Sequence, residues 1–143
     1  MGLWGILSGM RSAYLIIAHG SRERQSNRAF LELVEKFQKA FPQRKVAGAF
    51  LELAKPSIPA GIAQCLQSRA TEIFVIPFML FPGRHVKEHI PQFIEEARAK
   101  YNTVDFHYAG PLSDGPGLLR ILEEKISEIR HQKSNGKKSK RKR

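Results

Sequence analysis

YLIIA at residues 14–18 and IFVIPFML at residues 73–80 are short apolar runs that are continuous rather than alternating. Such runs are typical of strands buried on both faces of a parallel sheet. Each run is followed by a histidine close to a glycine, His19 after the first and His85 after the second. Because open α/β sheets bind ligands beyond the carboxyl ends of their strands, the two histidines are expected to share one cleft.

The rest of the chain alternates between strand and helix patterns. Helices are predicted over residues 26–40, 57–66, 91–99 and 115–130, and further strands over residues 45–53 and 104–108. The order βαβαβαβα predicts an α/β fold of three αβα layers, with a mainly parallel sheet of about four strands. The apolar stripe of the last helix is expected to face the sheet. Four strands are few for such a domain, and both edge strands of the sheet would be open or covered by something else. Dimerisation is therefore also expected.

Length and composition describe one globular domain with two atypical ends. The 143 residues are 42% hydrophobic and 26% charged, and the longest apolar run is too short for a transmembrane helix. Residues 1–12 are predicted to form an N-terminal extension with neither a secretory signal nor a myristoylation motif. Residues 131–143 hold seven basic residues and no acid, which predicts a disordered basic tail after a domain at residues 13–130.

The net charge of +11 falls to +4 once this tail is set aside, since 17 basic and 13 acidic residues remain. The predicted domain has no basic stripe interleaved with aromatic residues, so nucleic-acid binding is not expected as its main function. The tail fits either a solubilising role or attraction to RNA, an anionic membrane or an acidic partner.

The single cysteine, Cys65, can form no internal disulfide and fits a reducing compartment. We expect a cytoplasmic protein without membrane insertion, or one in an organelle stroma if the source bears plastids. The acid-free start of the chain is compatible with a short transit segment.

Three residues at successive strand ends carry the candidate chemistry. His19 and His85 offer imidazole nitrogens, which ligate divalent transition metals and exchange protons near neutral pH. Glu52 lies among apolar residues, where a carboxylate needs a partner such as a metal ion or a histidinium. Steps of 33 residues, about one βα unit each, separate the three residues. They are therefore expected to lie together at the carboxyl ends of the strands. The alternatives are structural histidines and an exposed glutamate.

His89 follows His85 by four residues, so on a helix the two would share a face, as paired zinc ligands do. The segment HVKEH is not the HExxH of zinc proteases, and Ser21 lacks the GxSxG surroundings of a hydrolase nucleophile. Neither a zinc protease nor a serine hydrolase is therefore expected. The alternative for His89 is a solvated histidine at the start of a helix.

LIIAHGSR, AFLELAKPSIP and PFMLFPGRHVKEHIP follow one another along residues 13–130. In order and approximate spacing they resemble the short class II tetrapyrrole chelatases, of the sirohydrochlorin cobaltochelatase and ferrochelatase type. The resemblance implies that His19, Glu52 and His85 surround the metal. One departure is His89, since relatives commonly have an aspartate before the Ile-Pro pair.

The resemblance implies a metal chelatase, a lyase that inserts divalent cobalt or iron into sirohydrochlorin in cobalamin or siroheme biosynthesis, with nickel as a third option. His19, Glu52 and His85 would be catalytic, and the two histidines would also hold the metal. Four further residues near the same strand ends are expected to bind the carboxylate-bearing macrocycle: Ser21, Arg22, Arg84 and Lys87. The alternative for the three cations is solvated surface charge. No cofactor is implied beyond the substrate metal ion.

The family includes chains of about twice this length, so the resemblance also implies that this chain is a single half that forms a homodimer. The alternative function is that of a non-catalytic carrier of divalent metal, which would use the same histidines and leave the macrocycle unchanged.

Overall fold

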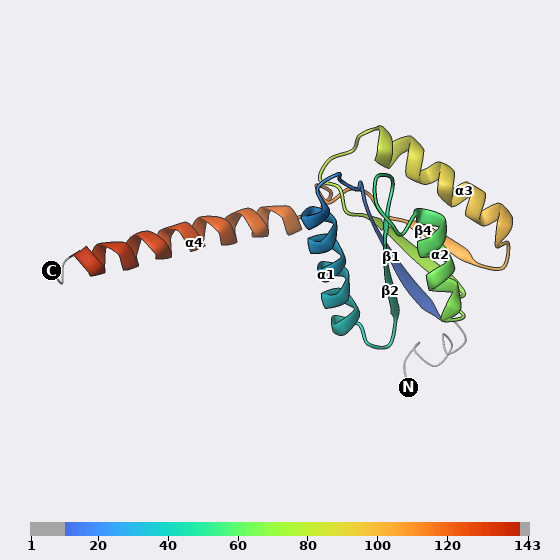
Figure 1. Ribbon diagram of the computed structural model, residues 1–143, viewed down its shortest axis with the longest axis horizontal. Helices are drawn as coiled ribbons and strands as arrows, with labels where there is room; N and C mark the ends of the chain where they lie inside the picture. Colours follow the sequence, from blue (N-terminus) through green and yellow to red (C-terminus); the bar gives the residue numbers. More distant parts are fainter. Residues whose placement is uncertain (1–10, 141–143) are drawn as a thin grey trace. The chain divides into compact units, whose positions relative to one another are not determined.

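The computed structural model describes the backbone of residues 11–140 and the side chains of residues 11–135. Its elements follow the predicted alternation (Figure 1). The strands are β1 (Ser12–Ala18), β2 (Lys45–Phe50), β3 (Glu72–Pro77) and β4 (Asp105–Tyr108), and the helices are α1 (Arg24–Ala40), α2 (Ile58–Gln67), α3 (Ile90–Lys100) and α4 (Gly117–Lys140). A π-helical turn, η2 (His85–His89), leads directly into α3. Most of the predicted N-terminal extension, residues 1–12, lies outside the described residues.

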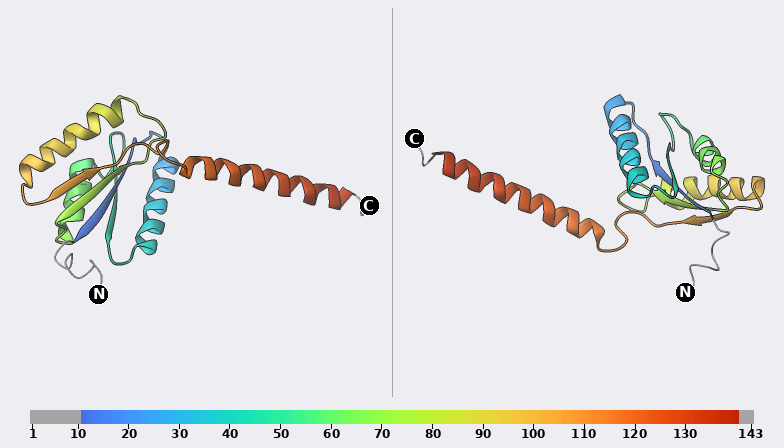
Figure 2. Two further views of the ribbon diagram at one scale, coloured as in Figure 1. Left: turned by 180° about the vertical axis from the view of Figure 1, so that it is seen from behind. Right: turned by 90° about the horizontal axis from the view of Figure 1, so that it is seen from below.

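The four strands form one parallel sheet in the order β2-β1-β3-β4, which confirms the predicted α/β fold. In the sheet, β2 lies on one side of β1, and β3 and β4 lie on the other side. Right-handed crossovers therefore place α1 on one face and both α2 and α3 on the other (Figure 2). The loops after β1 and β3 lie where the strand order reverses, the usual ligand site of such sheets.

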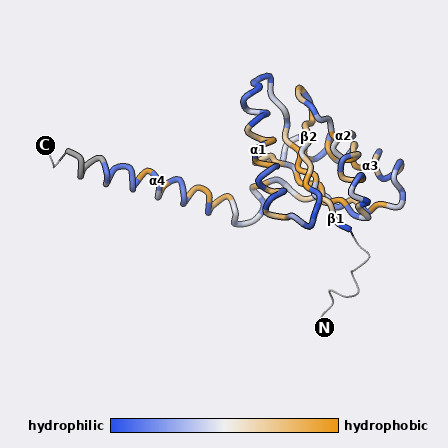
Figure 3. The backbone as a smooth tube through the Cα atoms, turned by 60° about the horizontal axis from the view of Figure 1, so that its bottom comes forward, coloured by the Kyte–Doolittle hydropathy of each residue, from blue (hydrophilic) through white to orange (hydrophobic). Residues whose placement is uncertain are grey.

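β1 is buried on both faces, and its alternate residues point into two different helix layers. Leu15 belongs to the larger core cluster with α2 and α3, whereas Ile16 packs with Phe30 and Val34 of α1. Figure 3 shows the hydrophobic strands at the centre of these layers. Because burial of each large aliphatic side chain stabilises the fold by about 1.5–3 kcal/mol, the strand that leads to His19 is firmly held.

The chain divides into two compact units, Met1–Pro111 and Leu112–Arg143. The second unit contains α4, which extends to Lys140, whereas the sequence predicted a domain ending at Arg130 and a disordered tail after it. Residues 118–135 contain neither proline nor glycine, so local helix propensity carries the helix past the predicted boundary.

The apolar stripe that was predicted to face the sheet lies on α4, in the second unit, where its side chains are exposed. Leu119 is 65% exposed and Ile129 is 55% exposed, and three further apolar residues of this helix are also more than half exposed. Figure 3 shows hydrophobic and hydrophilic positions alternating along α4. No helix among residues 11–140, α4 included, is both long and apolar enough to cross a lipid bilayer.

Candidate functional site

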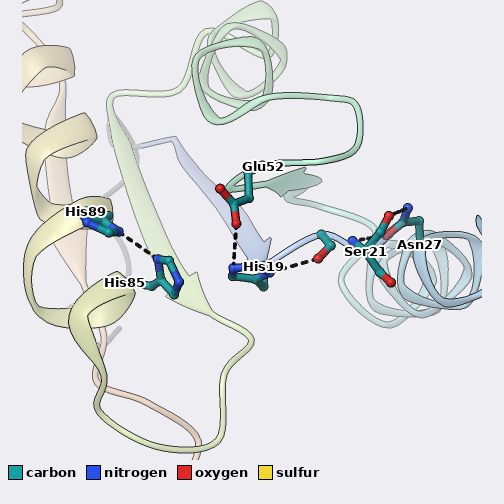
Figure 4. A network of polar contacts seen from close by, with 7 residues as sticks. His19, Ser21, Asn27, Glu52, His85 and His89 are labelled. Carbon is teal, nitrogen blue, oxygen red and sulfur yellow. Dashed lines mark hydrogen bonds and ion pairs between the residues drawn. The ribbon is translucent and has the colours of Figure 1, made fainter. Parts of the chain in front are cut away.

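His19, Glu52 and His85 meet at the carboxyl edge of the sheet (Figure 4). His19 directly follows β1, Glu52 lies just beyond β2, and His85 begins η2 after β3. Nε2 of His19 lies 3.0 Å from Oε1 of Glu52. The ring centroids of His19 and His85 are 4.6 Å apart, with an angle of 61° between the ring planes. The structure thus brings together the three residues that the sequence places at successive strand ends.

Main-chain hydrogen bonds continue past the ends of β1 and β2 and hold His19 beside Glu52. The amide of Leu51 donates to the carbonyl of Ala18 at 2.9 Å, and the amide of Glu52 donates to the carbonyl of His19 at 3.0 Å. Gly20 has a φ of +94°, and a Cβ at this position would lie 1.8 Å from the carbonyl oxygen of Glu52. Only glycine permits so close an approach, so the backbone itself sets the His19–Glu52 contact.

The hydrogen bonds of His19 define where its protons lie. Nδ1 lies 2.9 Å from the carbonyl oxygen of Gly20, which can only accept, so Nδ1 carries a hydrogen. Nε2 lies 3.0 Å from the carboxylate of Glu52, so a proton on either group can be shared between them. A metal ion that binds Nε2 would displace this proton, which couples metal binding to proton release.

His85 lies on η2, which is anchored from the neighbouring strand β4. The hydroxyl of Tyr108 donates to the carbonyl of Val86 at 2.6 Å. Burial raises the pKa of Tyr108 to about 12, so the phenol remains a donor at physiological pH. No sequence pattern pointed to Tyr108 as a support of the site, since it lies 22 residues from the turn that it anchors.

The pKa of His85 lies below its ordinary value of 6.5, mainly because burial disfavours the charged ring and also because His19 and His89 lie close to it. His85 therefore keeps its neutral, metal-binding form to lower pH than an ordinary histidine does. We expect an NMR titration of its ring signals to give a midpoint below 6.5. A midpoint at or above that value would contradict this expectation, and with it the wider pH range of metal binding at this ring.

Ser21, predicted to contact the macrocycle, is engaged within its own loop. Its hydroxyl accepts a hydrogen bond from the amide of Glu23 at 3.0 Å. The side chain of Asn27 in α1 accepts from the amide of Ser21 at 2.9 Å and donates to its carbonyl at 2.7 Å. Sequence reasoning missed Asn27, whose only signal is its place in the first turn of a helix. These contacts fix the loop that follows His19.

The three predicted cationic contacts lie close in sequence to the two histidines. Arg22 follows the His19 loop, Arg84 and Lys87 flank His85, and all three are exposed. Nε of Arg84 lies 3.4 Å from Oε2 of Glu88, an exposed ion pair that contributes little to stability. These cations are therefore available to a negatively charged ligand at the sheet edge.

A pocket of about 270 Å³ opens beside Glu52, His85 and His89. Its other lining residues are Leu51, Gln92, Phe93 and Glu96. The volume lies just below the range of about 300–1,000 Å³ common for small-molecule sites, so a large flat ligand would have to extend beyond the pocket. Among the described side chains, no three histidine, cysteine, aspartate or glutamate residues form a ready cage for a metal ion.

Comparison with known proteins matches most of the chain to one family. The family model described as CbiX matches residues 13–129. The chain is 34% identical over 118 residues to the chloroplastic sirohydrochlorin ferrochelatase of Arabidopsis thaliana. This match covers 82% of the present chain and 52% of the relative. The chain is also 36% identical over 115 residues to the sirohydrochlorin cobaltochelatase of Priestia megaterium. That match covers 80% of the present chain and 37% of the relative.

The fold is also similar to that of a solved chelatase. The sirohydrochlorin chelatase SirB from Bacillus subtilis subspecies spizizenii, in complex with cobalt, matches with a TM-score of 0.74 at 28% sequence identity. This match covers 84% of the present chain and 51% of the SirB chain. The chain therefore spans about half of the length of these relatives, or less.

Proposed function

The chain belongs to the CbiX family, and on this premise we propose that it is a chelatase that inserts a divalent metal ion into sirohydrochlorin. The observation that carries the proposal is the meeting of His19, Glu52 and His85 at the carboxyl edge of the sheet. Cobalt and iron are the proposed substrate ions, with nickel as a third option, because nitrogen ligands suit all three. None of the named relatives supports the alternative of a non-catalytic metal carrier.

In this proposal the two histidines hold the incoming ion, and Glu52 handles protons. Insertion replaces two pyrrole protons of the macrocycle with one divalent ion, so a base near the metal is required. When the ion binds Nε2 of His19, the proton shared with Glu52 is displaced. That proton leaves to water, which frees the carboxylate to accept the two pyrrole protons one after the other and to pass each of them to water, since the Glu52 side chain is 53% exposed.

We assign binding of the macrocycle to polar residues close in sequence to His19 and His85. The carboxylates of the macrocycle pair with Arg22, Arg84 and Lys87, and the arginines can offer a bidentate fork. The hydroxyl of Ser21 accepts from a backbone amide and keeps its own hydrogen available for a ligand carboxylate. No cofactor is proposed beyond the substrate ion.

We propose that the working form is a homodimer. The pocket beside His85 is too small to enclose a tetrapyrrole, and the solved relative is about twice as long as the segment that matches it. A second copy would supply the missing wall over the macrocycle. Sedimentation equilibrium at micromolar concentration is expected to give twice the 16.2 kDa chain mass, and a monomer alone would contradict the proposal.

The proposed compartment is the cytoplasm, or the stroma of an organelle if the source bears plastids. The Arabidopsis relative is named as chloroplastic, which supports the second option.

An anaerobic absorbance assay tests the proposed activity. Purified full-length protein is added to sirohydrochlorin with Co(II), Fe(II) or Ni(II) in turn, and each spontaneous rate is subtracted. We expect a protein-dependent spectral shift with at least one ion, and the relative rates rank the metals. No acceleration with any ion, from a sample that circular dichroism shows to be folded, would overturn the proposal.

A further inference from the structure

His89 contacts His85 through the two Nδ1 atoms, which lie 2.7 Å apart. The ring centroids are 4.8 Å apart, and η2 turns both rings to the same side (Figure 4). Two bare nitrogens would repel each other at this distance, and so would two N–H groups. One Nδ1 must therefore donate a hydrogen bond and the other must accept it.

Only one of the two arrangements leaves His85 able to bind a metal ion. A neutral imidazole has one N–H group and one lone pair. If His85 accepted at Nδ1, its hydrogen would lie on Nε2, and no lone pair would remain there for a metal. If His85 donates from Nδ1 to His89, the lone pair lies on Nε2. The contact with His89 thus decides which nitrogen of His85 is available.

We propose that His89 is a positioning residue that accepts the Nδ1 hydrogen of His85 and so keeps Nε2 of His85 free for the metal ion. The inference rests on the proposed function, which assigns metal binding to His85. It gives both metal-binding histidines the same arrangement, because His19 donates its Nδ1 hydrogen to the carbonyl of Gly20. Metal-binding histidines usually donate their second N–H to such an acceptor, which orients the ring and fixes the tautomer.

Histidine-labelled full-length protein allows the tautomer of His85 to be measured without any metal. Long-range proton–nitrogen NMR at about pH 8, where neutral histidines dominate, shows which ring nitrogen carries the hydrogen. The wild type is expected to have the hydrogen of His85 on Nδ1. Loss of the corresponding signals in His85→Gln assigns them.

Two substitutions of matched shape separate the acceptor at residue 89 from the bulk of its side chain. In His89→Asn, Oδ1 is bonded to Cγ as Nδ1 is in histidine, so the acceptor stays in place and His85 is expected to keep its tautomer. His89→Leu has a similar branched shape and no acceptor, so the hydrogen of His85 is expected to move to Nε2. The same tautomer in all three proteins, or an Nε2 hydrogen in the wild type, would overturn the inference.

Cobalt binding gives a second readout that does not depend on turnover. We expect Co(II), followed by its visible absorption, to bind His89→Leu about 10–100-fold more weakly than the wild type. His89→Asn should stay within a few-fold of the wild type. His131→Leu, an exposed position on α4, is the control and should match the wild type.

The outcomes distinguish this inference from the proposed function. Equal Co(II) affinity in His89→Leu and the wild type overturns the positioning role, whether or not the chain inserts metal. If His89→Leu does not fold, His89→Gln replaces it, because its amide lies one bond further out and should weaken Co(II) binding in the same way. The expected tautomers and affinities without any insertion into sirohydrochlorin would overturn the proposed function alone.

Discussion

Substitution of either His19 or His85 with alanine is expected to slow metal insertion by about 100-fold or more. Each ring provides one of the two imidazoles that meet at the sheet edge, with centroids 4.6 Å apart. Removal of one leaves the ion with a single imidazole, and His19→Ala also removes the group that shares a proton with Glu52. The measurement is the anaerobic absorbance assay with sirohydrochlorin and Co(II).

The fold should survive both substitutions, because these side chains lie at the edge of the sheet and that of His19 is 42% exposed. Circular dichroism of both variants is therefore expected to match the wild type. His131→Ala, which changes an exposed histidine on α4, serves as the control and should insert metal at the wild-type rate. Full activity in His19→Ala or His85→Ala would remove that residue from the proposed site.

Gly20→Ala is expected to destabilise the protein by more than about 2 kcal/mol and to abolish most insertion. The φ of +94° is unfavourable for any residue with a Cβ, and the new methyl group would lie 1.8 Å from the carbonyl oxygen of Glu52. The backbone must move apart at this point, which breaks the contact between His19 and Glu52. Urea unfolding measures the first effect, and the absorbance assay measures the second.

Gly83→Ala provides the matched control for this substitution. Gly83 precedes His85 by two residues, and a Cβ there would meet no atom within 4 Å. The free energy of unfolding of the Gly83→Ala protein is expected to stay within about 0.5 kcal/mol of the wild-type value. A Gly20→Ala protein as stable as the wild type would show that the close approach to Glu52 is not a constraint on the fold.

The sequence predicts β1 and β3 because short, continuous apolar runs are typical of strands buried on both faces of a parallel sheet. It also predicts that His19, Glu52 and His85 come together, since the steps between them match the length of a βα unit. The predicted start of the second helix, residue 57, lies one residue before α2. There the hydroxyl of Ser57 caps the helix by accepting from the amide of Ala60 at 3.3 Å.

The remainder depends on contacts that join distant parts of the chain. Within the π-helical turn η2, the carbonyl of Val86 accepts a hydrogen bond from the distant Tyr108. The local sequence HVKEH does not itself distinguish a π turn from an α turn. The expectation that the apolar stripe of α4 faces the sheet goes beyond what periodicity can predict. Periodicity shows that one face of a helix is apolar, and it does not show what covers that face.

The hydrogen bonds that continue past β1 and β2 give the site the stability of the sheet. The amides of Leu51 and Glu52 donate to the carbonyls of Ala18 and His19 as strand residues do, so this part of the loop opens only when hydrogen bonds at the end of β1 break. Local unfolding is common in loops that lack such pairing. Here the register of β1 and β2 sets the distance between the imidazole of His19 and the carboxylate of Glu52. On heating, the two side chains are therefore expected to separate only when the sheet itself unfolds.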